Sequence, residues 1–361
     1  IICNQTIEPL EVIVIDDCSI DNTYQTIKQI AMDNYLVHAF KNDKNMGAAQ
    51  TRNRGLEIAK GDYIVFLDAD DVFSPFFLEK MYRSIEDNHA DVVCCKSEVV
   101  NMKDYSKRIF GQWKRLSEII PEGEELIVEK PIEYPGIISL IDLVAWSKML
   151  RRDYLLEHRI NFQNISAFND LSFALLSCLL ARKIVFINEV LVEYHQFNEG
   201  SISSKRQENY CPIVEAYSRV LENETIYKSD NFSDFMNRAL HNILAIAFEE
   251  NRSREGRIFI LEKLKNIYGK YDLMNMNIDT ICQYSLEYIG SNPLHNVNKT
   301  ALVNYMFGKM LKTGNKKIVI SYKNSELNIV NNLKACIRNK YLDRLIFREN
   351  EGEYHVRELC I

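Results

Sequence analysis

Two groups of aspartates each follow a short apolar run near the start of the chain. The pair Asp16-Asp17 comes directly after residues 12–15, and Asp68-Ala-Asp-Asp71 comes directly after residues 63–67. If these runs are strands of an open parallel sheet, both groups lie at the edge where ligands bind. Carboxylates gathered in this way repel one another unless a cation lies among them. Oxygen ligands favour Mg²⁺ or Mn²⁺, which bind through one or two carboxylates together with substrate phosphates. The pattern indicates a site for a sugar nucleotide or a nucleoside triphosphate.

A purely structural role is the alternative, because aspartates at strand ends also cap turns and helices. For Asp16-Asp17 the sequence favours neither the functional nor the structural role. For residues 68–71 we favour the functional one, since three carboxylates within four residues are costly to gather without a ligand.

A glycine followed by two arginines forms a third candidate group. Gly47 permits a tight turn into a helix. Arg52 and Arg54 lie two positions apart on that helix and therefore on different faces. We expect one of them to reach a diphosphate and the other to face solvent. The alternative, that both are surface charges, stays open at this point.

The elements that must position these groups alternate along the first part of the chain. Apolar runs and helical spacing predict strands at 12–15, 36–40, 63–67 and 91–95 and helices at 23–32, 47–59 and 75–85. Ser74 is expected to cap the last of these helices, with Pro75 in its first turn. Strands separated by helices of this length predict an α/β fold with a mostly parallel central sheet and helices on both faces.

The pattern changes farther along. Residues 101–137 read as connections, after which we expect helices at 139–156 and 168–180 and short strands at 184–187 and 190–194. From about residue 205 the predicted elements are helices at 208–222, 232–250, 256–267, 278–288 and 299–312, then a strand at 318–321, a helix at 326–340 and a strand at 345–347. We therefore predict an α/β domain over 1–204 and a mainly α-helical region with a short α/β tail over 205–361.

Composition excludes several classes of protein. Of 361 residues, 47% are apolar and 26% are charged, which argues against disorder, collagen and coiled coil. A net charge of −6 argues against nucleic-acid binding, and no apolar run approaches the length of a membrane span. The nine cysteines form no CxxC pair, which argues against structural zinc and fits a reducing compartment. Dinucleotide-binding, P-loop, serine-hydrolase and zinc-protease motifs are absent from the sequence.

Three segments together resemble the family 2 glycosyltransferases of the GT-A fold. They are Glu11-Val-Ile-Val-Ile-Asp-Asp-Cys-Ser-Ile-Asp21, Asn45-Met-Gly-Ala-Ala-Gln-Thr-Arg-Asn-Arg-Gly55 and Gly61-Asp-Tyr-Ile-Val-Phe-Leu-Asp-Ala-Asp-Asp71. Their order, spacing and flanking residues match the family, and a weaker likeness continues to about residue 204. The resemblance is specific for the family and says little about the sugar.

The resemblance implies a donor site that includes His195 and four residues of the three matched segments. Asp17 corresponds to the aspartate that contacts the nucleobase of the donor, and Arg52 to a basic residue of the donor site. Asp68 and Asp70 form the DxD motif, in which the first lies close to the ribose and the metal and the second is the metal ligand. The implied cofactor is Mn²⁺ or Mg²⁺, and the implied donor is a UDP-sugar.

The resemblance also implies a single catalytic carboxylate, Asp170, which acts as general base on a weakly nucleophilic acceptor hydroxyl. His195 lies in the segment that closes over the diphosphate in the family. From the residues alone, Asp170 also fits a first-turn residue beside the helix dipole, and His195 also fits a packed histidine. We expect Trp146 to be a core residue. For Trp113 the hypothesis is that its side chain faces the acceptor.

The chain departs from the family at three places. The family opens with a strand and a helix, but Ile1-Ile-Cys-Asn-Gln-Thr6 already corresponds to the end of that helix. We therefore expect a record of a longer protein that lacks the first strand, with the fragment alone poorly active. Cys18 stands where the family commonly has Gly, so a positive φ there would strain it. Asn169 replaces the usual Glu before the base.

The leading hypothesis is an inverting, metal-dependent glycosyltransferase of cell-envelope or capsule synthesis, which acts on a glycan or lipid-linked acceptor. We expect it in the cytoplasm, at the inner face of the cell membrane, with peripheral membrane contact and no nucleic-acid partner. A sugar nucleotidyltransferase shares the sheet and the carboxylates. A third hypothesis is a truncated, non-catalytic module that acts through its helical C-terminal region.

Overall fold

The chain divides into two units, residues 1–206 with 215–235, and residues 207–214 with 236–361. The structure is a computed structural model. It describes residues 5–134, 137–196, 211–232, 235, 239, 243, 272–273, 276–277, 317–322, 344–349 and 356–360.

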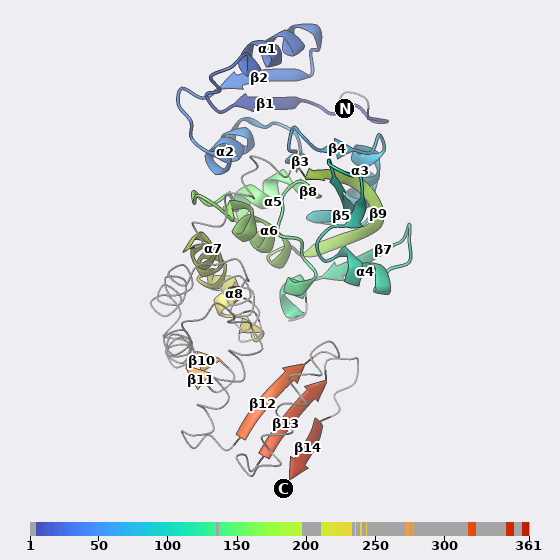
Figure 1. Cartoon of the computed structure of the whole chain (residues 1–361), viewed down its shortest axis with the longest axis vertical. Helices are drawn as coiled ribbons and strands as arrows, with labels where there is room; N and C mark the ends of the chain where they lie inside the picture. The colour runs from blue at the N-terminus through green and yellow to red at the C-terminus, as the bar shows by residue number, and fades with distance from the viewer. Residues whose placement is uncertain are drawn as a thin grey trace. The chain divides into compact units, whose positions relative to one another are not determined.

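The first unit begins with a β1–α1–β2 segment followed by a second helix (Figure 1). β1 (Val12–Asp16) and β2 (Val37–Lys41) pair in parallel, and α1 (Thr23–Asp33) joins them. α2 (Ala48–Ile58) starts directly after Gly47, whose φ of +80° suits a residue without a side chain. These four elements confirm the strands and helices predicted between residues 12 and 59.

Seven more strands form the main sheet of this unit, in the order β3–β8–β5–β9–β4, with β6 on β5 and β7 on β9. Their bounds are β3 Tyr63–Val65, β4 Val72–Phe73, β5 Val92–Asn101, β6 Lys107–Ile109, β7 Glu125–Glu129, β8 Lys148–Arg151 and β9 Lys183–Gln196. β5 and β9 pair in parallel, and β8 is antiparallel to both β3 and β5, so β3, β5 and β9 run in one direction. The predicted α/β class is confirmed. The sheet is mixed, because short antiparallel strands join the parallel set that the sequence indicates.

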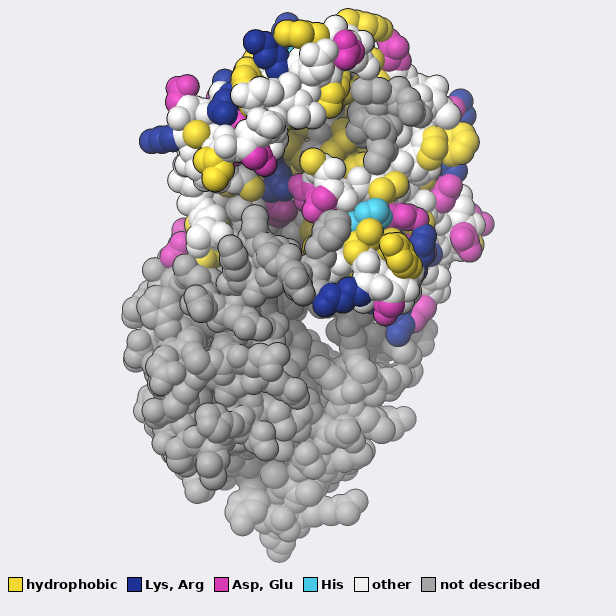
Figure 2. Space-filling view, turned by 45° about the horizontal axis from the view of Figure 1, so that its top comes forward, with side chains coloured by type: hydrophobic (Ala, Val, Ile, Leu, Met, Phe, Trp, Pro, Cys, Tyr) yellow, Lys and Arg dark blue, Asp and Glu magenta, His cyan; other side chains and the backbone are white. Residues whose placement is uncertain are grey.

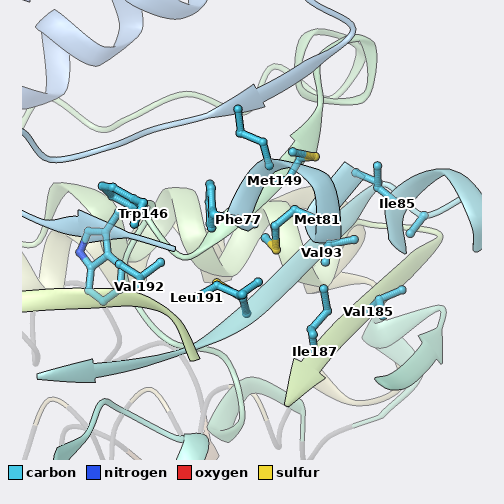
Figure 3. Packing of buried hydrophobic residues seen from close by; sticks show 14 residues of the cluster. Phe77, Met81, Ile85, Val93, Trp146, Met149, Val185, Ile187, Leu191 and Val192 are labelled. Carbon is cyan, nitrogen blue, oxygen red and sulfur yellow. The ribbon is translucent and has the colours of Figure 1, made fainter. Parts of the chain in front are cut away.

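The core of the unit lies where α3 (Phe77–Asp87) covers this sheet (Figure 3). Phe77, Met81 and Ile85 stand four residues apart on one face of the helix and are fully buried. They pack against the sheet in a cluster that includes Val93 of β5 and Val185 of β9. Burying a side chain of this size contributes about 1.5–3 kcal/mol, so this face fixes α3 on the sheet.

The helix predicted at 139–156 is wrong. That stretch holds a 3₁₀ turn at Ile137–Ser139, strand β8, and then the short helix α5 (Arg152–Glu157). Lys148, Met149 and Leu150 of β8 are all buried, because the strand lies inside the sheet. A strand buried on both faces shows no alternation of polar and apolar residues, so its pattern resembles that of a buried helix.

Other boundaries also differ from the prediction. The stretch 101–137, predicted as connections, contains β6, β7 and α4 (Trp113–Ile119). α3 begins two residues after Pro75, and Ser74 Oγ accepts a hydrogen bond from the Phe76 amide at 3.3 Å. The two short strands predicted at 184–194 are one strand, β9, whose pairing with β5 shifts register after Cys95.

The predicted helix at 168–180 is confirmed as α6 (Asn169–Leu179), and the one at 208–222 corresponds to α7 (Cys211–Leu221). A short helix, α8 (Glu224–Tyr227), follows. In the second unit, β12 (Lys317–Tyr322) and β13 (Arg344–Glu349) pair in parallel and confirm the two strands predicted in the tail. β14 (Val356–Cys360) is antiparallel to β13, and β10 (Asp272–Leu273) is antiparallel to β11 (Met276–Asn277). The helices predicted at 256–267, 278–288, 299–312 and 326–340, and most of 232–250, lie outside the described residues.

Within the part of the chain that the structure describes, no helix combines the length and the apolar character needed to cross a bilayer.

Candidate functional site

The predicted site residues come from five segments of the first unit. They are Asp17 after β1, Arg52 on α2, Asp68 and Asp70 after β3, Asp170 in the first turn of α6, and His195 near the end of β9. Figure 2 shows one face of the described residues, on which basic, acidic and hydrophobic side chains lie next to one another around a hollow.

The Asp17 carboxylate organises the turn that leads into α2. Its Oδ1 accepts hydrogen bonds from the Met46 amide at 2.8 Å and from Asn42 Nδ2 at 2.7 Å. Its Oδ2 accepts one from the Gly47 amide at 2.7 Å. Burial acts to raise the pKa of Asp17, but these hydrogen bonds outweigh it and lower the pKa. The structure thus gives Asp17 the turn-capping role that the sequence left open, and its contact with a nucleobase stays a prediction.

Asp16 and Cys18 complete this turn. The Asp16 carboxylate is buried, accepts a hydrogen bond from the Ser19 amide, and lies 3.3 Å from Lys41 Nζ. Cys18 adopts a φ of +64°, a conformation that an L-residue with a Cβ adopts at a cost. The strain expected at this position is therefore present in the structure.

Arg52 joins two carboxylates that lie 102 positions apart in the sequence. Its Nη2 donates to Asp68 Oδ1 at 2.7 Å, and its Nη1 donates to Asp170 Oδ1 at 2.9 Å. Burial acts to lower the pKa of Arg52, but the two carboxylates outweigh it and raise the pKa. One guanidinium therefore links the first residue of the DxD motif to the predicted base.

The support beneath this guanidinium is aromatic. The Arg52 guanidinium lies 5.4 Å from the centre of the Phe162 ring, a distance at which a cation is attracted to an aromatic face. The neighbouring Asn53 holds the backbone of Phe162 by two hydrogen bonds, Nδ2 to the carbonyl at 2.9 Å and Oδ1 from the amide at 2.8 Å.

The DxD loop contains a further carboxylate, Asp71, that is almost fully buried. Its Oδ1 accepts a hydrogen bond from the His195 amide at 3.1 Å, and its Oδ2 has no hydrogen-bond partner in the described part. Burial raises the pKa of Asp71 to about 7, and the charges of Asp68 and Asp70 act in the same direction against the His195 amide. Burial is thus the main cause, and the neighbouring carboxylates of the loop add to it.

The carboxylates of the DxD loop are suitable ligands for a divalent cation, but they do not form a complete coordination shell. Among the described residues there is no group of three or more His, Cys, Asp or Glu side chains that would hold a metal by itself. Mg²⁺ usually takes only one or two carboxylates and completes its shell with water and substrate phosphates. Asp68 and Asp70 offer that number of carboxylates on one loop, and the side chain of Asp68 is one-third exposed.

The structure brings Arg52, Asp68 and Asp170 into direct contact, and it joins His195 to the same loop through Asp71. The His195 side chain lies 3.8 Å from Glu193 Oε2. Of the two arginines on α2, one was expected to reach a diphosphate and the other to face solvent. Arg54 is only partly exposed. Its Nη1 donates to the Lys41 carbonyl at 2.8 Å and to Asn42 Oδ1 at 2.5 Å.

Sequence reasoning missed Asn53 and Phe162 as parts of the site, and it included Asp71 only as a member of the acidic group at 68–71. Asn53 stands beside Arg52 within a matched segment, which was the available signal, but nothing in the sequence pairs it with Phe162. Trp113 does not face an acceptor, because it is buried on α4 against Phe186. Trp146 is a core residue, as predicted.

Residues 2–155 match the family model described as glycosyl transferase family 2. Over this segment the chain is therefore similar to the family 2 glycosyltransferases. A cholesterol galactosyltransferase of Borreliella burgdorferi is 29% identical over 206 residues, which cover 56% of this chain and 56% of that protein. The glycosyltransferase GlyG of Streptococcus pneumoniae is 27% identical over 226 residues, which cover 60% of this chain and 72% of that protein.

A solved structure agrees with this likeness at the level of the fold. Staphylococcus aureus TarS 1-349 in complex with UDP-GlcNAc superimposes with a TM-score of 0.57 at 19% identity and covers 86% of each chain. This likeness shows that the domain has the GT-A architecture.

Proposed function

We propose that the chain is an inverting, metal-dependent glycosyltransferase that moves a hexose or an N-acetylhexosamine from a UDP-sugar to a glycan or lipid-linked acceptor. The observation that carries the proposal is the Arg52 bridge. It brings the donor-side carboxylate Asp68 and the proposed base Asp170 to the two terminal nitrogens of one guanidinium.

In the proposed reaction Asp170 accepts the proton of the acceptor hydroxyl as the hydroxyl oxygen attacks the anomeric carbon. The bond between that carbon and the diphosphate oxygen breaks, and UDP leaves from the opposite face, so the configuration inverts. A single carboxylate base suffices for this displacement, without the second carboxylate of a glycosidase. A divalent cation held by Asp68 and Asp70, when bound, would neutralise negative charge on the leaving diphosphate.

The names of the relatives support the substrate classes. TarS of Staphylococcus aureus is a poly(ribitol-phosphate) β-N-acetylglucosaminyltransferase, and its structure was solved with UDP-GlcNAc. The Borreliella relative is named as a cholesterol galactosyltransferase. By analogy with these relatives, we propose that the donor of this chain is a UDP-sugar and that its acceptor belongs to the cell envelope. We place the reaction in the cytoplasm, at the inner face of the cell membrane.

Calorimetric titration of UDP tests the donor site. With Mn²⁺ present, the chain is expected to bind UDP, and EDTA is expected to abolish binding. Asp70→Ala removes a proposed metal ligand and should abolish binding as well, whereas Asp87→Ala removes an exposed carboxylate from the end of α3 and should not. Equal UDP affinity in Asp70→Ala and wild type would contradict the proposal.

Turnover of UDP-sugars tests the base. Asp170→Asn should retain UDP binding and reduce UDP release by about 10²–10⁴-fold, the usual contribution of general-base catalysis. Unchanged turnover in this variant would remove Asp170 from the mechanism. Pyrophosphate released from a nucleoside triphosphate and a sugar phosphate would instead identify a nucleotidyltransferase.

A further inference from the structure

We propose that Asn53 and Phe162 form a positioning unit that sets the separation of Asp68 and Asp170 by holding Arg52 between them. This inference rests on the proposed function, because it assigns those two carboxylates to donor binding and to base catalysis. Asn53 and Phe162 touch neither substrate nor metal in this proposal, and they act only through Arg52.

The first part of the unit is the link between α2 and the loop before α6. Asn53 uses its amide nitrogen and its amide oxygen on the same residue, the carbonyl and the amide of Phe162. A two-way hydrogen bond of this kind fixes both distance and orientation, in contrast to a single contact. It joins residues that stand 109 positions apart.

The second part is a cluster of three rings. Phe162 stacks on Phe173 with ring centres 4.0 Å apart and an interplanar angle of 9°. Phe66 meets both rings edge-on, at 4.8 Å from Phe162 and 5.4 Å from Phe173. Stacked and edge-to-face arrangements of this kind are the favoured ones for aromatic pairs.

Each outer ring belongs to a segment that carries a site carboxylate. Phe66 stands two residues before Asp68, and Phe173 stands three residues after Asp170 on α6. Since both rings pack on Phe162, the cluster joins the DxD segment to the helix of the base beneath the guanidinium. All three rings are buried, so the arrangement is shielded from water.

Arg52 completes the unit from above. Its guanidinium lies over the Phe162 ring and donates sideways to Asp68 and Asp170, so an aromatic face and two carboxylates hold it. Because Arg52 and Asn53 are neighbours on α2, the backbone that places the guanidinium is the backbone that Asn53 fastens to Phe162. Displacement of the ring would therefore move the guanidinium and alter the separation of the two carboxylates.

The test is UDP-sugar hydrolysis, with water as the acceptor, measured on the full chain alongside UDP affinity and thermal stability. UDP-Glc, UDP-Gal and UDP-GlcNAc serve as probes. Asn53→Ala should reduce kcat about 10- to 100-fold, the effect expected from a small misplacement of catalytic groups. The KM for the donor and the affinity for UDP should change less than kcat does, because Asp17 and Asp70 are left in place.

Gln163→Ala is the matched control. Gln163 is the residue after Phe162, and its Nε2 donates to the Glu215 carbonyl at 3.3 Å, so the variant also removes a bond from side chain to backbone in this loop. Its contact leads away from Arg52, and kcat should stay at the wild-type value.

A second variant covers the case in which Asn53→Ala does not fold. Phe162→Leu keeps an apolar side chain under Arg52 but removes the flat ring, and kcat should again fall with UDP affinity retained. If both residues act through Arg52, the fold-losses of the double variant should be smaller than the product of the single losses.

The outcomes separate the two proposals. A wild-type chain that neither binds UDP nor hydrolyses any UDP-sugar overturns the proposed function and this inference with it. A wild-type chain that is active, with kcat unchanged in Asn53→Ala and Phe162→Leu, overturns the inference alone. The inference is also overturned if Gln163→Ala loses as much kcat as Asn53→Ala, because Asn53 would then have only a structural role.

Discussion

Two helices of equal length, α1 and α3, bury their side chains to very different extents. Each has 11 residues with apolar side chains at helical spacing. α1 contacts β1 and β2 but contains no buried residue, and Met32 near its end is 68% exposed. α3 buries Phe77, Met81 and Ile85 completely. An amphipathic sequence therefore sets which face of a helix is apolar, while the elements packed against it decide how much of that face is covered.

The candidate site spans these two regions. Asp17 belongs to the lightly covered β1–α1–β2 segment, whereas Asp68 and Asp170 belong to the segments around the densely packed sheet. α2 contacts β1, and its Arg52 reaches both of the other carboxylates. The proposed base, Asp170, thus lies on a helix held by packed aromatic rings, and the predicted nucleobase contact, Asp17, lies on a turn fixed by hydrogen bonds. Tight packing favours a rigid geometry around Asp170, while fewer buried contacts favour lower local stability around Asp17.

A pair of methionine substitutions tests this contrast most strongly. Met81→Ala removes a fully buried side chain from α3 and should lower the free energy of unfolding by about 2–5 kcal/mol. Met32→Ala makes the same chemical change at an exposed position of α1 and should alter it by less than about 0.5 kcal/mol. Urea denaturation of both variants measures the difference.

A loss in Met32→Ala comparable with that in Met81→Ala would contradict the contrast. It would mean that another part of the protein covers the apolar face of α1 in solution.

Local sequence patterns predicted several elements closely. β1, β2, α2 and α6 lie within a residue or two of the predicted bounds, because an apolar run or helical spacing marks each of them. β8 was not predicted, since it is buried on both faces and carries a charged residue, Lys148, into the interior. Its ammonium donates hydrogen bonds to the Asp142 and Val144 carbonyls, and no sequence pattern predicts such partners.

The candidate site divides in the same way. The motif positions gave Asp68, Asp170 and Arg52 as separate predictions, and the structure adds that one guanidinium links them. The Asn53–Phe162 contact joins distant positions through backbone atoms, which any residue type except proline would offer at position 162. Spacing along the chain carries no information on such a contact, so it required the fold.

The packed region also contains a buried carboxylate whose protonation should make stability depend on pH. Burial raises the pKa of Asp142 to about 6, although the Gln112 amide and Lys148 act to lower it. Between its ordinary pKa of 3.8 and about 6, the folded chain holds a proton that the unfolded chain has released. Asp142 therefore favours folding at low pH, and this contribution is lost as the pH rises to about 6.

Asp142→Asn removes that titration while an amide oxygen can still accept from the Gln112 amide, which now donates to Asp142 Oδ1 at 2.7 Å. Relative to wild type, the variant should gain about 2–3 kcal/mol of unfolding free energy between pH 4 and pH 7, from about 1.4 kcal/mol per pKa unit. Urea denaturation across this range measures the gain, and the exposed Asp87→Asn serves as control. A difference that does not change with pH would show that Asp142 is charged throughout.

The smallest effect is expected in the lightly covered region, at Cys18. Its φ of +64° places a Cβ in a conformation that costs an L-residue about 1–2 kcal/mol, and glycine does not incur this cost. Cys18→Gly should therefore raise the unfolding free energy by about 1 kcal/mol or less, because glycine also makes the unfolded chain more flexible. Cys18→Ala keeps the Cβ and removes only the thiol, whose Sγ lies 3.7 Å from the Asp43 carbonyl.

If Cys18→Ala stabilises the chain as much as Cys18→Gly, the thiol and not the backbone is the source of the strain. If neither does, the turn between β1 and α1 relaxes in solution. The Asp17 carboxylate, which depends on that turn, would then be less firmly placed than Asp170 on its packed helix.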